Sequence, residues 1–155
     1  MRKIFHDQMS IGEVSIEDIE ISIKSRDDVP RILHGLQYIY KDKKIREELF
    51  KLLESVIPEH IDKSNGRPGM ELWKVFVMST LRVHLNWDYD RLEEMVNNHK
   101  TIRLMMGHSE YDDTSYERKT LQNNLRLLTP ELLDSINHLI VKAGHKLVKK
   151  KMKSR

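Results

Sequence analysis

The fold of this chain is decided by residues 70–85, which read MELWKVFVMSTLRVHL. Apolar side chains occur so often in this stretch that they cover almost the whole surface of a helix built from it. Such a helix has no polar side to turn toward water, so it is stable only when other helices surround it. We therefore expect a helix over 70–85 at the centre of its domain, with Trp73 in the core.

Amphipathic patterns upstream of this stretch predict two more helices. The first is expected over 28–40, where Asp27 and Pro30 suit the first turn of a helix. The second is expected over 43–57 and is ended by Pro58, because proline cannot continue the backbone hydrogen bonds of a helix.

Breaks in the apolar pattern divide the downstream sequence into four further helices. Residues 86–88 (NWD) end the central helix, and Asp88 suits the cap of the next one. Gly107 suits the left-handed end of a short helix, and Thr114 with Glu117 forms a capping box. The last three predicted helices begin near Thr101, Thr114 and Thr129. We expect an all-α fold, a multi-helix bundle whose short turn and following basic helix resemble an elaborated helix-turn-helix.

The first 25 residues differ from the rest, because Ile19, Ile21 and Ile23 alternate with polar residues. This spacing predicts an extended arm or a single strand, whose backbone needs a partner in another subunit, another domain or water. The predicted organisation is an arm over 1–25, a helical domain over 26–148 with any internal sub-boundary at 58–69, and a basic tail over 149–155.

The composition excludes several classes of protein. The chain has 155 residues, of which 39% are hydrophobic and 33% are charged, and it has no cysteine. Disulfides, thiol catalysis and thiolate metal sites are therefore excluded. No apolar run approaches the roughly 18–20 residues of a membrane span, and the N-terminus lacks the apolar core of a secretory signal. We expect a cytoplasmic protein with no membrane partner.

The charge is concentrated at the C-terminus. Residues 142–155 hold seven basic side chains and no acid, whereas the first 141 residues hold 20 basic and 24 acidic side chains. This segment suits contact with a polyanion, although cations also complement the C-terminal end of a helix dipole. We expect Lys146, Lys149, Lys150 and Lys151 to contact DNA phosphates in a sequence-independent way.

One side of the helix predicted over 114–128 is rich in hydrogen-bond donors and has no carboxylate. Arginine suits guanine, asparagine and glutamine suit adenine, and lysine and serine suit phosphates. Two interpretations stay open, a DNA-reading face and an ordinary solvated face, and the helix near 89–99 is the competing recognition helix. The candidate DNA contacts are Ser115, Arg118, Lys119, Gln122, Asn123 and Arg126.

No constellation of residues indicates catalysis. The only local cluster of metal-ligating types is His108 near Glu110, Asp112 and Asp113, and a metal there would need a ligand from elsewhere. We interpret this cluster as a polar loop that precedes a helix. The chain also lacks a glycine-rich phosphate loop and a nucleophile elbow, so we expect no catalytic residue, no metal ligand and no cofactor.

Four motifs in a fixed order resemble the N-terminal region of insertion-sequence transposases, most nearly the ISNCY group. That group is similar to a larger set whose N-terminal helical domain begins with Gly-Arg-Pro. The motifs are GRPGM at 66–70, LNWDYDRL at 85–92, MGH at 106–108 and LTPELL at 128–133.

The resemblance implies a DNA-binding region that recognises the terminal inverted repeats of an insertion sequence. In such families an RNase H-like domain follows, whose Asp-Asp-Glu triad holds two divalent metals for strand transfer. None of the acids here matches that triad, so we expect double-stranded DNA binding without strand-transfer chemistry. Divalent metal is expected only in the missing catalytic domain.

A second interpretation stays open, in which the chain is a helical dimerisation or regulatory module. Its partner would be a second copy of the chain or the full-length transposase. The alternating Ile19–Ile23 stretch and the apolar stripe of the last helix motivate this alternative.

Overall fold

The computed structural model of the chain describes residues 3–6, 9–22, 27–57 and 69–153, with side chains described as far as Lys142. All regular structure in these ranges is helical, so the expected all-α fold is confirmed. The elements are the 3-10 turn η1 (Ile16–Asp18) and the helices α1 (Asp28–Lys41), α2 (Lys43–Glu54), α3 (Leu72–Leu85), α4 (Tyr89–Asn98), α5 (Lys100–Met106), α6 (Arg118–Leu125) and α7 (Pro130–Lys153).

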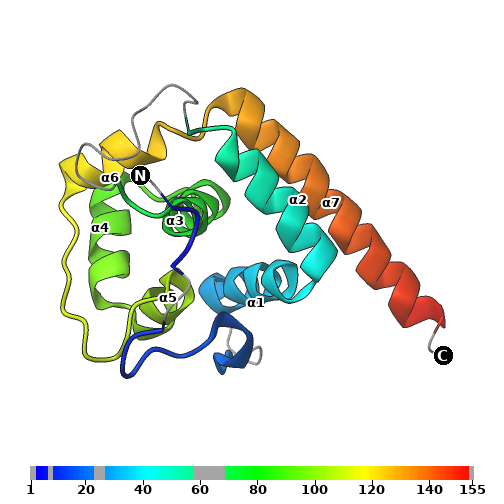
Figure 1. Cartoon of the computed structure of the whole chain (residues 1–155), viewed down its shortest axis with the longest axis horizontal. Coiled ribbons are helices and arrows are strands. Elements are labelled where there is room, and N and C mark those ends of the chain that lie inside the picture. Colours follow the sequence, from blue (N-terminus) through cyan, green and yellow to red (C-terminus); the bar gives the residue numbers. More distant parts are fainter. Residues whose placement is uncertain (1–2, 7–8, 23–26, 58–68, 154–155) are drawn as a thin grey trace.

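Helix α3 lies at the centre of the bundle, where it packs against α1, α4, α5 and α6 (Figure 1). Trp73 is fully buried, and its ring N–H donates to the carbonyl of Met105 at 2.7 Å. The prediction of a central apolar helix with Trp73 in the core is therefore confirmed. The fully buried apolar side chains of α3 are Leu72, Trp73, Val75, Phe76, Val77, Met78 and Leu81.

Several helix ends lie where the capping residues predict them. Asp27 accepts the backbone N–H of Val29 at the start of α1, and Asp88 accepts that of Arg91 at the start of α4. Gly107 follows α5 with a φ of 95°, the left-handed conformation that closes a helix. These caps satisfy backbone groups that the helices themselves leave unpaired.

The predicted start of the helix over 114–128 is wrong, because α6 begins at Arg118. The hydroxyl of Thr114 donates to Asp112 instead of capping a helix. The side chain of Asn97 on α4 bonds both backbone groups of Tyr116, at 2.9 and 2.7 Å. Tertiary hydrogen bonds thus replace the capping box and hold the preceding residues in an extended loop.

The N-terminal arm packs against the helices of its own chain. The side chain of Gln37 on α1 donates to the carbonyls of Ile16 and Ile19, each at 2.9 Å. Ile16 and Ile19 are both buried, whereas Ile23 lies outside the described residues. The arm is extended at Ile19, as expected, but Ile16–Asp18 form the 3-10 turn η1 instead of an extended segment, and α1 is the partner that the sequence did not identify.

The arm also completes the start of α3. The backbone N–H groups of Leu72 and Trp73 donate to the carbonyls of Lys3 and Ile4, at 3.0 and 2.8 Å. The ring of Phe5 packs beside Trp73, with 6.1 Å between ring centroids. These bonds satisfy N–H groups at a helix end whose own cap residue makes no side-chain bond.

Helix α7 is the longest helix and packs along α2 (Figure 1). Ile136 and Leu139 of α7 are buried. The C-terminal half of α7 extends past the N-terminal end of α2 and away from the other helices (Figure 1). Among the described helices, none combines the length and the apolar character that crossing a bilayer requires.

Candidate nucleic-acid interface

The solvent-facing side of α6 carries no carboxylate. Lys119 and Asn123 are exposed, while Leu121 and Leu125 on the opposite side are buried. Lysine and asparagine end in nitrogen donors, which suit phosphate oxygens and the edge of adenine. The structure places these two residues outward, as the sequence predicts.

Three further candidates lie at or near this surface in different settings. Ser115 is exposed, but it lies in the extended loop before α6 and does not share the helix face expected for it. Gln122 is half-buried on α6. Arg126 is exposed at the end of α6 and lines a hollow of about 370 Å³ with residues of α7 and the segment after α2.

Arg118 is exposed but has an acidic partner. Its guanidinium lies 3.1 Å from the carboxylate of Asp90 on α4, and the two side chains are 57% and 74% exposed. Its backbone N–H donates to the carboxylate of Glu93 at 2.6 Å. Arg118 is therefore held by α4 at both its backbone and its side chain.

The solvent-facing side of α4 is acidic. Asp88, Asp90 and Glu94 are all exposed, and Asp88 and Asp90 lie at the N-terminal end of the helix. Arg91, the one exposed cation of α4, pairs with Glu94 at 3.3 Å. Phosphates that approached this side would be repelled, and this disfavours α4 as the recognition helix.

His108 occupies the centre of a buried hydrogen-bonded cluster. It is 3% exposed, and its ring nitrogens lie 2.7 Å from a carboxylate oxygen of Asp112 and 2.5 Å from the hydroxyl of Tyr116. Burial would raise the pKa of Asp112, but hydrogen bonds from Thr114 and His108 hold it well below its usual range. An ionised Asp112 only accepts, so Nδ1 of His108 donates to it and Nε2 accepts from Tyr116.

This cluster has a structural explanation. Burial lowers the pKa of His108 and raises that of Tyr116, so both side chains are neutral near pH 7. Both ring nitrogens of His108 are already engaged, so neither has a lone pair free for a metal. Among the described residues, no group of three or more histidine or carboxylate side chains is arranged to hold a metal ion.

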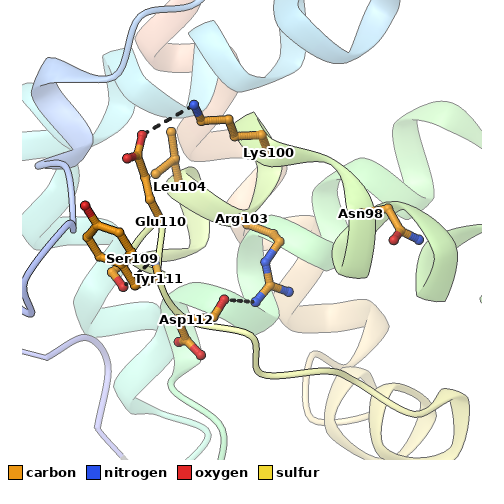
Figure 2. Close-up of a pocket in the computed structure, with 8 residues that line it drawn as sticks. All are labelled: Asn98, Lys100, Arg103, Leu104, Ser109, Glu110, Tyr111 and Asp112. Carbon is orange, nitrogen blue, oxygen red and sulfur yellow. Dashed lines mark hydrogen bonds and ion pairs between the residues drawn. The ribbon is translucent and has the colours of Figure 1, made fainter.

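A pocket of about 470 Å³ lies between α5 and the loop that follows it (Figure 2). The guanidinium of Arg103 donates to the carbonyls of Asp112 and Thr114, at 3.0 and 2.8 Å. Lys100 pairs with Glu110 at 3.3 Å. The two cations that line this pocket are thus occupied in holding the loop, which sets the path of the chain into α6.

The tail lysines belong to the helical backbone of α7. Lys146, Lys149, Lys150 and Lys151 lie in its C-terminal half, and their side chains lie outside the described residues. The C-terminal half of α7 lies away from α3 and α4 (Figure 1).

Comparison of the chain with protein-family models, with curated protein sequences and with solved structures gave no match. The transposase resemblance therefore depends on the four sequence motifs. In the structure, 85–92 forms the turn between α3 and α4, 106–108 ends α5, and 128–133 begins α7. Of the remaining motif, only Gly69 and Met70 are described.

Proposed function

We propose that this chain binds double-stranded DNA and reads its site with the exposed side of α6. The observation that carries the proposal is the carboxylate-free surface of Lys119, Asn123 and Arg126 on a helix with its opposite side buried. A solvated face in a chain with this many acids would ordinarily mix in Asp or Glu. Following the transposase resemblance, the target is the terminal inverted repeat of an insertion sequence. We assign binding, and no strand-transfer chemistry, to these helices.

The charge distribution favours α6 over α4 as the recognition helix. Helix α6 contains no acid and has one exposed acid, Glu117, at its N-cap, whereas α4 exposes Asp90 and Glu94 along its length and Asp88 at its N-cap. A recognition helix lies between two phosphate backbones in the major groove, so acids along its outer side oppose entry. Arg118, Gln122 and Ser115 lie beside this surface and are the further candidate contacts.

The basic end of α7 supplies attraction that is independent of DNA sequence. Residues 142–155 hold seven basic side chains and no acid. Lysine contacts to phosphates release bound counterions, so they raise affinity for every duplex and make it depend on salt. Base contacts from α6 would then supply the specificity, and phosphate contacts from the tail would supply the affinity for any duplex.

The two features that motivated the regulatory alternative are partly explained within the chain. Ile19 is buried against its own chain, and its carbonyl is bonded by Gln37. The buried residues Ile136 and Leu139 belong to α7, which packs along α2. The described part of each feature thus packs within the chain, whereas Ile23 and the side chains of α7 beyond Lys142 lie outside the described residues.

The test is selection of duplexes from a random pool, followed by gel-shift titration at several salt concentrations. We expect one sequence to be enriched, and Arg126→Ala to weaken its binding by roughly 1–3 kcal/mol. Lys150→Ala should weaken all duplexes alike and flatten the salt dependence. Lys41→Ala, an equal charge loss on α1, is the control and should have little effect. No enrichment, or equal effects of Arg126→Ala and Lys41→Ala, contradicts the proposal.

A further inference from the structure

Two carboxylates of α4 hold the first residue of α6. Glu93 accepts the backbone N–H of Arg118 at 2.6 Å, and Asp90 lies 3.1 Å from its guanidinium. The two contacts differ in consequence. Glu93 fixes where α6 begins, whereas Asp90 fixes only where the side chain of Arg118 points.

Asp90 offers Arg118 the same kind of partner that a DNA phosphate would offer. Both are oxyanions that accept hydrogen bonds from a guanidinium. Moving Arg118 from Asp90 to a phosphate therefore exchanges one ion pair for another, with little net gain. A guanine edge differs, because its N7 and O6 accept two parallel hydrogen bonds in a geometry that arginine matches.

We infer that Asp90 is a specificity-determining residue of the DNA-reading surface. Its negative charge keeps the phosphates of unrelated DNA from Arg118, while its bond to a single guanidinium nitrogen leaves the other donors free for a matching base edge. This inference rests on the proposed function of α6, and it adds a role for an acid on a neighbouring helix.

The position of Asp90 makes this role testable without disturbing the fold. Its side chain is 74% exposed, and the cap of α4 is Asp88 rather than Asp90. The bond from Glu93 holds the backbone of Arg118 when Asp90 is replaced. Glu94 supplies a matched control, because it is an exposed acid one turn further along α4 that pairs with Arg91 instead.

The experiment compares Asp90→Asn with Glu94→Gln, using a synthetic duplex of random sequence and the duplex that the wild-type protein selects. Both variants lose one negative charge. Any loss of long-range repulsion between the protein and DNA should therefore raise their affinities equally. We expect Asp90→Asn to bind the random duplex more tightly than Glu94→Gln by about two- to fivefold, the range of exposed ion pairs. The gain on the selected duplex should be smaller, because Asp90 stays paired with Arg118 there and its loss also removes the group that orients the guanidinium, so the specificity ratio falls.

Arg118→Gln tests whether the effect of Asp90 depends on its pair with Arg118 or only on its negative charge. In the wild-type background, Arg118→Gln should weaken the selected duplex and leave the random duplex nearly unchanged, because Asp90 already occupies Arg118. In the Arg118→Gln background, the excess gain of Asp90→Asn over Glu94→Gln should disappear.

Two outcomes overturn the inference in distinguishable ways. If Asp90→Asn and Glu94→Gln behave alike, or if the excess gain persists without Arg118, the inference fails while the proposed function stands. If the wild-type protein binds neither duplex, the proposed function fails and the inference fails with it. Thermal melting of each variant by circular dichroism confirms that the comparison is between folded proteins.

Discussion

The carboxylate of Glu93 accepts the backbone N–H of Arg118 at 2.6 Å, so the first turn of α6 is capped by α4. The residue at the N-cap position, Glu117, makes no side-chain hydrogen bond to the helix. The start of the proposed DNA-reading helix is thus fixed by a side chain 25 residues away in sequence. This dependence leads to a test of stability that needs no DNA.

Replacing Glu93 with alanine removes this cap and leaves an N–H of α6 unpaired. We expect a loss of about 1 kcal/mol in the free energy of unfolding, typical of losing a helix cap. For a chain of this size the melting temperature should fall by roughly 2–4 °C, measured by circular dichroism. Glu94→Ala is the control, because its exposed pair with Arg91 contributes little. Equal shifts for the two variants would show that the cap does not stabilise α6.

Gly107 is expected to be intolerant of a side chain for two reasons. Its φ of 95° favours glycine, and an added Cβ would lie 2.5 Å from the ring of Phe5. Gly107→Ala should therefore cost at least about 1 kcal/mol of unfolding free energy and loosen the arm. Thermal melting measures the first effect, and amide exchange at Leu72 and Trp73, which donate to the arm, measures the second.

Gly35 provides the opposite prediction and serves as the control. It lies within α1, and an added Cβ would meet no atom within 4 Å. Gly35→Ala should therefore raise the free energy of unfolding by roughly 0.5–1 kcal/mol, because alanine is the better helix former. A destabilised Gly35→Ala, or a Gly107→Ala that melts like the wild type, would contradict this assignment.

The parts of the fold that depend on local pattern could be predicted from the sequence. The burial of α3 follows from apolar residues on all its sides, and the caps at Asp27, Asp88 and Gly107 follow from residue type and position. Such signals act within one or two turns of a helix. They do not require knowledge of which helices are neighbours in space.

The features that the sequence did not reveal depend on contacts between distant segments. The loop before α6 is held by Asn97 and Arg103, which bond backbone groups that every residue possesses. No residue pattern marks such a bond, so a plausible capping box at Thr114 gave the wrong helix start. The pairing of Arg118 with Asp90 was hidden for the same reason, because the two lie on different helices.

Acidification is expected to destabilise the fold through His99 and His108. Burial lowers the pKa of both histidines, and Nδ1 of His99 accepts the N–H of Ile102 as a cap, which requires an unprotonated nitrogen. The unfolded chain protonates near pH 6.5, so the contribution of both residues is complete above that pH. It is lost as pH falls below 6.5 toward the lowered pKa values.

The measurement is the melting temperature between about pH 5 and pH 6.5, a range in which histidine titrates and most carboxylates stay ionised. We expect the wild-type melting temperature to fall on acidification. His99→Asn keeps a side-chain acceptor for the cap without a titrating ring. Its melting temperature should fall less over the same range, and an unchanged slope would show that His99 does not contribute.

Protonated His6 is expected to stabilise the fold, and this contribution should be lost as pH rises above about 6.5. Burial would lower the pKa of His6, but hydrogen bonds to Glu13 and Glu71 outweigh this effect and raise it. Lys74 pairs with Glu71 beside this histidine. A raised pKa in the folded state contributes stability that is complete below pH 6.5 and is lost as pH rises through the folded value. The arm should therefore bind the start of α3 less tightly as pH increases from about 6.5 to about 8.

Amide exchange at Leu72 and Trp73 reports this loosening directly, since both N–H groups donate to the arm. In His6→Gln the exchange should be faster at low pH and should not change further across the titration, once the intrinsic rate is corrected for pH. Wild-type exchange that is equally independent of pH would show that the charge on His6 does not hold the arm in place.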